Sequence, residues 1–249
     1  MTNIISFQIL GFSGGIPTKD RITSCTIIST DNGNIMIDCG EGAYRKYIQN
    51  GYELGMLKNI FITHMHPDHI SGLVPILFYK NISNNISDIT IVAPAKVKSL
   101  IEFTLREQGV KLKYKCIFHD VENKQYLSIK DIRINWLLLE HKIPSWGYRI
   151  KDSSGSIVFI TDSRICDNSF KLAKNASVLI HEATFDNSRK SIAYNKFHCA
   201  PEDVISLAKS SLVRRLFLTH FSIDLSIEYL KNISYNGKKC VIFDKIQYL

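Results

Sequence analysis

Three of the eight histidines in this 249-residue chain stand within six positions, in the segment THMHPDHISG at 63–72. Together with one carboxylate they make four potential metal ligands: His64, His66, Asp68 and His69. Alternate residues of an extended loop point the same way, so His64 and His66 can bind one ion while Asp68 and His69 face a second. Imidazole and carboxylate ligands suit zinc, and carboxylates also admit manganese or iron. A polar loop with hydrogen-bonded histidines would explain one such residue better than four.

Two ions need more ligands than one loop provides. Asp162 and His220 each follow a short apolar run, FIT and FLT, as His64 follows another FIT, and His141 comes after the run LLLE. Rigid strands commonly place reactive groups on the loops that follow them. Taken singly, each residue is equally well explained as a turn residue, but together they are the candidates to complete the site.

The apolar pattern predicts an α/β protein. Short apolar runs predict strands, and the last of these is CVIF at 240–243. Longer periodic segments between the runs predict helices at 42–50, 72–80, 95–108 and 201–210, the last with Pro201 in its first turn. Because neither a linker nor a repeat interrupts the chain, we expect one domain over residues 1–249, with two packed sheets and helices outside them.

The composition bounds the class of protein. No apolar run approaches the roughly 18 to 20 residues of a membrane span, and the N-terminal segment lacks the pattern of a signal peptide. We therefore expect a cytoplasmic protein without a membrane partner. The formal charge of +8 favours an anionic partner such as a phosphate ester. The segment KLKYK at 111–115 alternates charged and apolar residues as a solvated edge strand would, and the alternative is a basic patch that contacts the substrate.

Motifs along most of the chain are similar to those of one enzyme family. The run THMHPDHISGL resembles the His-x-His-x-Asp-His signature of the metallo-β-lactamase fold, an αββα sandwich that binds two metal ions at one edge. Seven other segments between Leu10 and Ser222 resemble successive motifs of its ribonuclease Z branch, in the same order: LGFSGGIPT, MIDCGEGAYRKY, EHKIPSWGYRI, ITDSR, HEATF, FHCAPEDV and LTHFS. The resemblance implies the αββα fold and two divalent ions, zinc or alternatively manganese.

The resemblance also implies how the ligands divide between the ions. One ion would be held by His64, His66 and His141, the other by Asp68, His69 and His220, with Asp162 bridging both. Two ions so placed can make a nucleophile from water at neutral pH and bind both faces of an in-line phosphoryl displacement. Asp68 can also accept a proton from that water.

A phosphodiester also needs its leaving oxygen protonated. We assign this general acid role to His198 in KFHCAP, with Glu182 in HEATF as the carboxylate that orients it and keeps it charged. The alternative is that His198 only caps the helix at 201–210. His181 and Asp38 are expected to hydrogen-bond the ligands and orient them.

Two segments differ from the tRNA-processing members of the branch. A long arm that holds tRNA is replaced by only ten residues, 151–160, which read as a tight hairpin, and SIDLS replaces the usual Ser-x-Arg-Tyr after LTH. The chain thus resembles the arm-less cyclic nucleotide phosphodiesterases of the anti-Pycsar type. We expect hydrolysis of 3′,5′-cyclic mononucleotides to nucleoside monophosphates, countering cyclic-nucleotide antiphage signals, in the host cytoplasm if the gene is viral. The base could be held by Trp146 or Tyr148, although core packing is the more usual role of such residues.

Other functions fit less well. The alternatives are a tRNA 3′-processing endonuclease that manages without the arm, or another small phosphodiesterase of the branch. Diiron oxygen-reducing members resemble His-x-Glu-x-Asp in the first motif, and this chain has no glutamate there. The family resemblance further implies a homodimer.

Overall fold

The computed structural model describes residues 3–83, 86–241 and 245–249. Its first sheet has the strand order β15-β1-β2-β3-β4-β5-β6. Pairing is antiparallel from β15 to β3 and parallel from β3 to β6. The strands are β1 (Ile4–Gly11), β2 (Cys25–Thr30), β3 (Gly33–Ile37), β4 (Leu57–Phe61), β5 (Ile89–Ala93), β6 (Cys116–Asp120) and β15 (Gln247–Tyr248).

The second sheet has the strand order β12-β11-β10-β9-β8-β7. Here β7 to β10 are antiparallel and β10 to β12 parallel. The strands are β7 (Tyr126–Ile129), β8 (Ile132–Leu139), β9 (Ser145–Lys151), β10 (Ser156–Ile160), β11 (Val178–Glu182) and β12 (Arg215–Thr219). A small hairpin pairs β13 (Ser234–Tyr235) with β14 (Lys238–Lys239).

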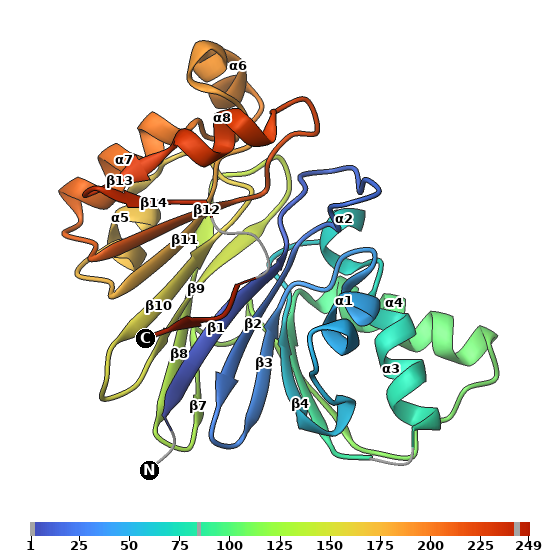
Figure 1. The fold of residues 1–249 in the computed structure, drawn as a ribbon. Coiled ribbons are helices and arrows are strands. Elements are labelled where there is room, and N and C mark those ends of the chain that lie inside the picture. Colours follow the sequence, from blue (N-terminus) through green and yellow to red (C-terminus); the bar gives the residue numbers. More distant parts are fainter. Residues whose placement is uncertain (1–2, 84–85, 242–244) are drawn as a thin grey trace.

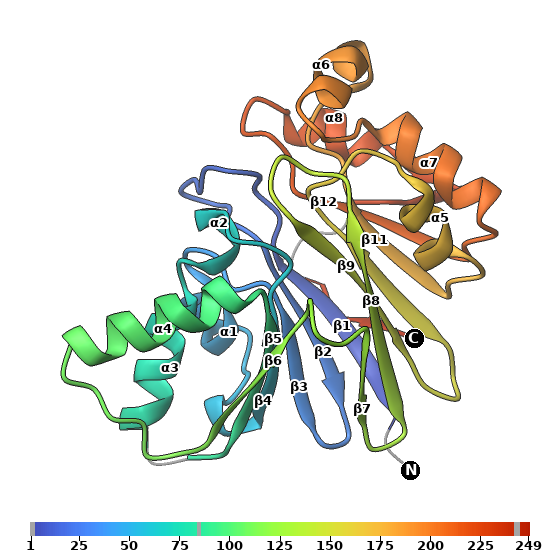
Figure 2. The same cartoon turned by 180° about the vertical axis from the view of Figure 1, so that it is seen from behind.

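Helices lie on the outer sides of the two facing sheets, as Figures 1 and 2 show. Those beside the first sheet are α1 (Ala43–Gln49), α2 (Pro67–Ile70), α3 (Leu73–Ile82) and α4 (Ala95–Glu107). Those beside the second are α5 (Asp167–Ala173), α6 (Lys190–Asn195), α7 (Pro201–Ser210) and α8 (Ile227–Asn232), with α6 standing out at the end of the layer. Single 3-10 turns are η1 (Leu54–Met56) and η2 (Asn187–Arg189).

The apolar strands are explained by burial on both faces. In β1, Ile9 packs in the core between the sheets, whereas Leu10 packs in the core under the helices; in β3, Ile35 and Met36 divide in the same way. Side chains alternate across a strand, so a strand covered on both faces must be apolar throughout. Each fully buried side chain of this size contributes about 1.5–3 kcal/mol. The strands therefore form a rigid base whose ends can hold polar loops.

Most of the predicted elements are present in the structure, but two predicted strands are not found as expected. The predicted helices correspond to α1, α3, α4 and α7. The expected strand at 111–115 is wrong: this segment is a loop, in which the Lys113 N–H donates to Asn81 Oδ1 and the Tyr114 hydroxyl to the Leu77 carbonyl. Because the Lys113 N–H and the Tyr114 hydroxyl already bond to α3, pairing with strand β5 starts only at Cys116. The sequence also predicts a strand at 240–243. Residues 240–241 do not form one, and 242–243 lie outside the described residues.

The two sheets share one hydrophobic core. A single domain over residues 1–249 is consistent with that core and stays a prediction. Among the described residues, no helix has both the length and the apolar character to cross a membrane.

Candidate metal centre

Loops at one end of the two sheets carry the predicted ligands. Polar residues follow β3, β4, β8, β10 and β12, each within three residues of the strand end. Three of them, Asp38, Asp162 and His220, adopt positive φ angles of 58°, 47° and 56°. Asp and His are among the few side chains that tolerate this conformation, which here turns the chain sharply as it leaves the strand. The strand ends thereby direct side chains from both sheets into one place.

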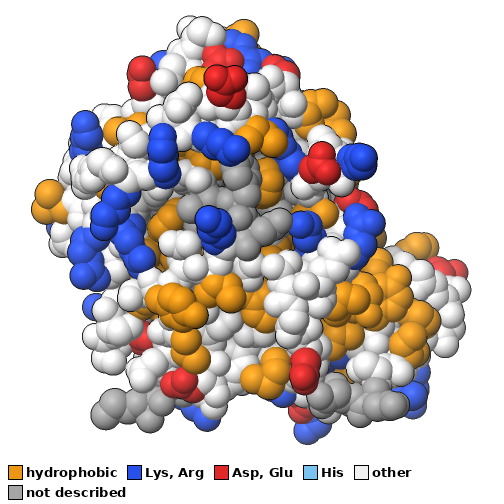
Figure 3. All heavy atoms as spheres, viewed as in Figure 1, with side chains coloured by type: hydrophobic (Ala, Val, Ile, Leu, Met, Phe, Trp, Pro, Cys, Tyr) orange, Lys and Arg blue, Asp and Glu red, His pale blue; other side chains and the backbone are white. Residues whose placement is uncertain are grey.

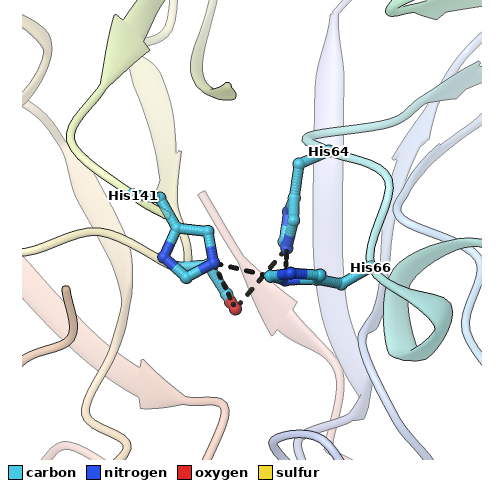
Figure 4. Close-up of side chains that lie close together, drawn as sticks. His64, His66 and His141 are labelled. Atoms are coloured by element: carbon cyan, nitrogen blue, oxygen red, sulfur yellow. Dashed lines mark hydrogen bonds and ion pairs between the residues drawn. The ribbon is translucent and has the colours of Figure 1, made fainter. Parts of the chain in front are cut away.

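A first cluster contains three imidazoles and one carboxylate. His64 Nε2 lies 2.9 Å from His66 Nδ1, which lies 3.2 Å from His141 Nε2. Asp162 Oδ2 is 3.6 Å from both His64 Nε2 and His141 Nε2. Figure 4 shows the three labelled rings pointing toward one another from three different directions. Their ligand atoms all lie within 4.8 Å of one another.

A second cluster adjoins the first and shares Asp162. His69 Nε2 lies 3.3 Å from His220 Nε2 and 3.3 Å from Asp68 Oδ2, and His220 Nε2 lies 3.2 Å from the same oxygen. Asp162 Oδ1 is 3.3 Å from His69 Nε2 and 3.0 Å from His220 Nε2. Asp162 therefore presents one oxygen to each cluster, as a bridging ligand must.

The donor set fits two divalent cations. Imidazole nitrogens 2.0–2.1 Å from a tetrahedral zinc lie roughly 3.3 Å apart, close to the separations found here. Burial lowers the pKa of His64, with a further contribution from His69, so its ring is neutral and available as a ligand. Burial raises the pKa of Asp68, but hydrogen bonds with His220 and His69 outweigh this and lower it overall. Asp68 therefore stays ionised at neutral pH, as a carboxylate ligand must be.

Asp38 and Thr63 fix the orientation of two of these imidazoles. Asp38 Oδ2 lies 2.7 Å from His69 Nδ1, while Oδ1 accepts from the Thr63 N–H at 2.8 Å. The Thr63 hydroxyl lies 3.0 Å from His64 Nδ1. Carboxylates and hydroxyls on the second ring nitrogen select the tautomer that leaves Nε2 free to bind metal. Sequence reasoning proposed Asp38 but missed Thr63, although a threonine precedes His64, Asp162 and His220 alike.

His198 lies beside the clusters with a carboxylate behind it. Its Nδ1 is 2.7 Å from Glu182 Oε1 and 3.2 Å from the hydroxyl of Thr184, which also lies 3.0 Å from His220 Nδ1. Burial alone would lower the pKa of His198, but the charge and hydrogen bond of Glu182 raise it to about 9. His198 is therefore a cation at neutral pH. Thr184, which links His198 to His220, was missed from the sequence.

Glu182 holds this region together. The completely buried carboxylate accepts from the backbone N–H groups of Ser163, Thr184 and Cys199 at 2.9, 3.2 and 3.2 Å. Burial raises its pKa, yet His198 lowers it overall. The N-cap residue of α7 is Ala200, so His198 does not cap that helix.

Two glycines pack against the second cluster. The Gly15 N–H donates to Asp68 Oδ2 at 2.8 Å. A Cβ on Gly14 would lie 2.9 Å from His220 Nδ1, so any side chain there would displace the imidazole. The motif LGFSGGIPT thus brings the backbone close to two of the predicted ligands, a role that is visible only in the folded structure.

Three residues singled out in the sequence lie elsewhere. His181 Nδ1 bonds the Glu182 carbonyl at 2.8 Å, and its buried Nε2 has no hydrogen-bond partner in the described part of the chain. Adjacent residues of a strand face opposite sides. Because the side chain of Glu182 faces the clusters, that of His181 faces away and does not contact a predicted ligand. Trp146 and Tyr148 are buried in the core, where the Tyr148 hydroxyl donates to the Ile62 carbonyl, and they do not form a base-binding face.

Comparisons with known proteins give the family. A family model described as anti-Pycsar protein Apyc1 matches residues 5–233. Ribonuclease Z of Thermosynechococcus vestitus is 28% identical over 270 residues, covering 88% of this chain and 66% of that protein's own length. Human tRNase Z, short form, superposes with a TM-score of 0.81 and 25% identity over 88% of this chain and 93% of that one. The metallo-β-lactamase fold protein YhfI of Bacillus subtilis gives 0.82 and 22% over 98% of both chains. The chain therefore belongs to the anti-Pycsar protein Apyc1 family, in the ribonuclease Z-like branch of the metallo-β-lactamase-fold hydrolases.

Proposed function

We propose that this protein is a dinuclear-metal phosphodiesterase that hydrolyses 3′,5′-cyclic mononucleotides to nucleoside monophosphates. The observation that carries the proposal is the sharing of Asp162 by two ligand clusters, with the cationic His198 beside them. Two adjacent cation sites suit a substrate with one phosphate, and a charged imidazole suits a leaving oxygen that must be protonated. Membership of the anti-Pycsar family supports the choice of a cyclic nucleotide.

In this proposal, three histidines of the first cluster and three residues of the second hold the two ions, with Asp162 between them. When bound, the ions would supply Lewis acidity toward the phosphate and a lowered pKa for water. The ligand residues are His64, His66 and His141 for one ion, and Asp68, His69 and His220 for the other. Zinc fits the imidazole-rich set, and manganese remains the alternative.

The chain's own residues would move the protons. A water oxygen forms a bond to phosphorus while the bond from phosphorus to a ribose oxygen breaks, and His198 gives a proton to that ribose oxygen. Glu182 stabilises the charged form of His198 before transfer and orients its ring through Nδ1. Asp68 is the proposed acceptor for the proton that the water loses. The reaction adds one water and leaves a nucleoside monophosphate.

The short connection between β9 and β10 supports a small substrate. These strands pair directly from Ser156 with Lys151 to Phe159 with Tyr148. The turn between them is closed by Asp152, whose Oδ1 accepts from the N–H groups of Ser154 and Gly155 at 2.8 and 3.0 Å. No arm extends from this hairpin to hold a large folded RNA.

A tRNA 3′-processing endonuclease is the second candidate. Relatives named ribonuclease Z and human tRNase Z favour it. So do the lysine and arginine side chains spread over much of the face in Figure 3, because basic surfaces attract nucleic acid. A groove of about 220 Å³ is lined by four basic residues: Arg214, Arg215, Lys238 and Lys239.

The deciding experiment compares the two substrates directly. The purified protein, loaded with zinc or with manganese, is incubated with a panel of 3′,5′-cyclic mononucleotides, with 2′,3′-cyclic phosphates and with a tRNA precursor carrying a 3′ trailer. We expect the highest kcat/KM for one or more 3′,5′-cyclic mononucleotides. Faster cleavage of the tRNA precursor would establish the second candidate, and a preference for 2′,3′-cyclic phosphates would indicate another phosphodiesterase of the branch.

Three expectations about context remain proposals. A homodimer and a role in countering cyclic-nucleotide antiphage signalling are proposed from the family resemblance, and a cytoplasmic location is proposed from the composition of the sequence. Size measurement in solution tests the first of these. Protection of a phage against a cyclic-nucleotide defence, lost in the Asp162→Ala variant, tests the last.

A further inference from the structure

Arg164 lies at the junction of three loops of the site. Its backbone N–H donates to the Glu140 carbonyl at 3.2 Å, and its side-chain Nε donates to Glu140 Oε2 at 2.7 Å. The guanidinium carbon lies 4.6 Å from the ring centroid of Tyr194 and 4.7 Å from that of Phe197. Arg164 thus connects the loop after β8, the loop after β10, and α6 with the segment that follows it.

The residues that Arg164 contacts are chain neighbours of proposed catalytic and ligand residues. Glu140 immediately precedes His141, and Phe197 immediately precedes His198. The Phe197 carbonyl also accepts from His141 Nδ1 at 3.3 Å. A displacement of the Phe197 backbone would therefore move the general acid relative to the metal ligands.

Phe197 needs support from its surroundings. Its φ angle is 60°, in the left-handed region that bulky side chains rarely occupy. Such a conformation persists only where neighbouring groups hold it. The face of the Phe197 ring lies against a guanidinium whose own position is fixed by Glu140, and cation–π contacts of this kind are attractive.

We propose that Arg164 is a positioning residue for His198, acting through Phe197. This inference rests on the proposed role of His198 as the proton donor in the phosphodiesterase reaction. Arg164 gives no atom to either ligand cluster, so its removal should leave the metal ions in place. The proton donor would instead lose its place over the leaving oxygen.

The test uses two substrates that differ in their need for a proton donor. A cyclic mononucleotide expels a ribose alkoxide, which must be protonated, whereas bis(p-nitrophenyl) phosphate expels a stable phenolate. For Arg164→Ala we expect kcat for the cyclic nucleotide to fall by about 10 to 10², the usual cost of misplacing a catalytic group. KM, metal content and turnover of bis(p-nitrophenyl) phosphate should stay within about twofold of wild type. His198→Ala should show the same selectivity for the cyclic nucleotide, and adding Arg164→Ala to it should cost little more.

Three control variants make the result specific. Arg106, like Arg164, bonds a glutamate and lies over a phenylalanine ring, but it lies on the exposed surface of α4. Arg106→Ala should therefore match wild type in kcat on both substrates. Phe197→Leu removes the ring under the guanidinium and should repeat the selective loss, which keeps the test usable if Arg164→Ala does not fold. Arg164→Lys keeps the charge without the planar face and should fall between wild type and Arg164→Ala.

Other outcomes would overturn the inference. Equal losses on both substrates would place the effect at the metal centre or in the fold. A raised KM with unchanged kcat would make Arg164 a substrate contact, which the cavity of about 290 Å³ that it lines with Tyr194 and His198 allows. Additive losses in the double variant would separate Arg164 from His198. Should wild type cleave bis(p-nitrophenyl) phosphate but no cyclic mononucleotide, the proposed function fails, and the same comparison is made with the tRNA precursor as the substrate with the poor leaving group.

Discussion

Asp162 is the residue on which the proposed chemistry depends most. Its two oxygens face different clusters, and the side chain is almost completely buried among His64, His69, His141 and His220. The positive φ of Asp162 places the carboxylate there directly at the end of β10.

We therefore predict that Asp162→Ala loses at least one metal ion per chain and nearly all activity. In the proposed centre this carboxylate would be shared by both ions, so its loss would weaken the binding of each. Metal content by elemental analysis and turnover of a cyclic mononucleotide are the measurements. Asp167→Ala, an exposed residue in the first turn of α5, is the matched control and should behave as wild type. Two ions per chain with normal turnover in Asp162→Ala would refute the bridging assignment.

A second prediction concerns the pH dependence of turnover. Glu182 raises the pKa of His198 to about 9, and a general acid works only while protonated. Turnover should therefore fall as the pH rises through about 9. In Glu182→Gln the negative charge is absent, the pKa of His198 drops toward its ordinary value, and the falling limb should move to lower pH. kcat measured from pH 6 to 10 tests this, and an unmoved limb would show that His198 is not the group that titrates.

At the scale of elements, one side chain joins the β9–β10 hairpin to the first sheet. Asp152 closes the turn and its Oδ2 accepts from the Ile4 N–H of β1 at 2.6 Å. Burial raises the pKa of Asp152, but the hydrogen bonds from Ile4 and Ser154 outweigh it and lower the pKa overall. The hairpin that replaces an arm is thus attached to the sandwich at its base.

We predict that Asp152→Ala lowers the free energy of unfolding by about 1–3 kcal/mol at pH 7, because buried N–H groups lose their acceptor. A depressed pKa stabilises the folded state above the ordinary value near 4 and loses that effect as the pH falls through the folded value. The difference from wild type should be constant between pH 7 and 5 and narrow below about pH 4. Urea unfolding at several pH values measures it. Ser153→Ala, in the same turn, should change little, and a difference that widens at low pH would contradict the assignment.

The agreement between sequence and structure was best where a pattern is local. The helix at 201–210 could be predicted because Pro201 and the apolar period mark it, and the histidine loop because its ligands are adjacent in sequence. The loop at 111–115 could not be predicted in this way. Charged and apolar residues do alternate there, but its backbone N–H groups donate to the side chains of Asn81 in α3 and of Asp88.

For the same reason, Thr184 and Gly14 become visible only when distant strands meet. Thr184 contacts His220, thirty-six positions away, and Gly14 contacts the same ring from the other end of the chain. No periodicity in the sequence carries such a contact. Side chains that support ligands are therefore harder to predict than the ligands themselves.

At the scale of the whole molecule, the basic groove and the proposed metal centre lie at opposite ends of β12. Arg215, which lines the groove with Arg214, Lys238 and Lys239, begins this strand, whereas His220 of the second cluster follows its last residue. A mononucleotide bound at the metal centre has one phosphate and cannot also occupy this surface. A folded RNA can, and each phosphate neutralised there would add to the salt dependence of its binding.

We predict that KM for a cyclic mononucleotide changes by less than about threefold between 50 and 200 mM salt, whereas any tRNA cleavage weakens by about 10³ or more if six or more phosphates are contacted. Lys238→Ala combined with Lys239→Ala should leave cyclic nucleotide hydrolysis unchanged and reduce only tRNA binding, because both side chains lie on the exposed hairpin β13–β14. Steady-state kinetics at four salt concentrations measure both effects. A cyclic nucleotide KM that rises as steeply as that of tRNA would mean that the basic surface takes part in small-substrate binding. A tRNA precursor cut efficiently at high salt would mean that the loss of the arm does not limit this enzyme to small substrates.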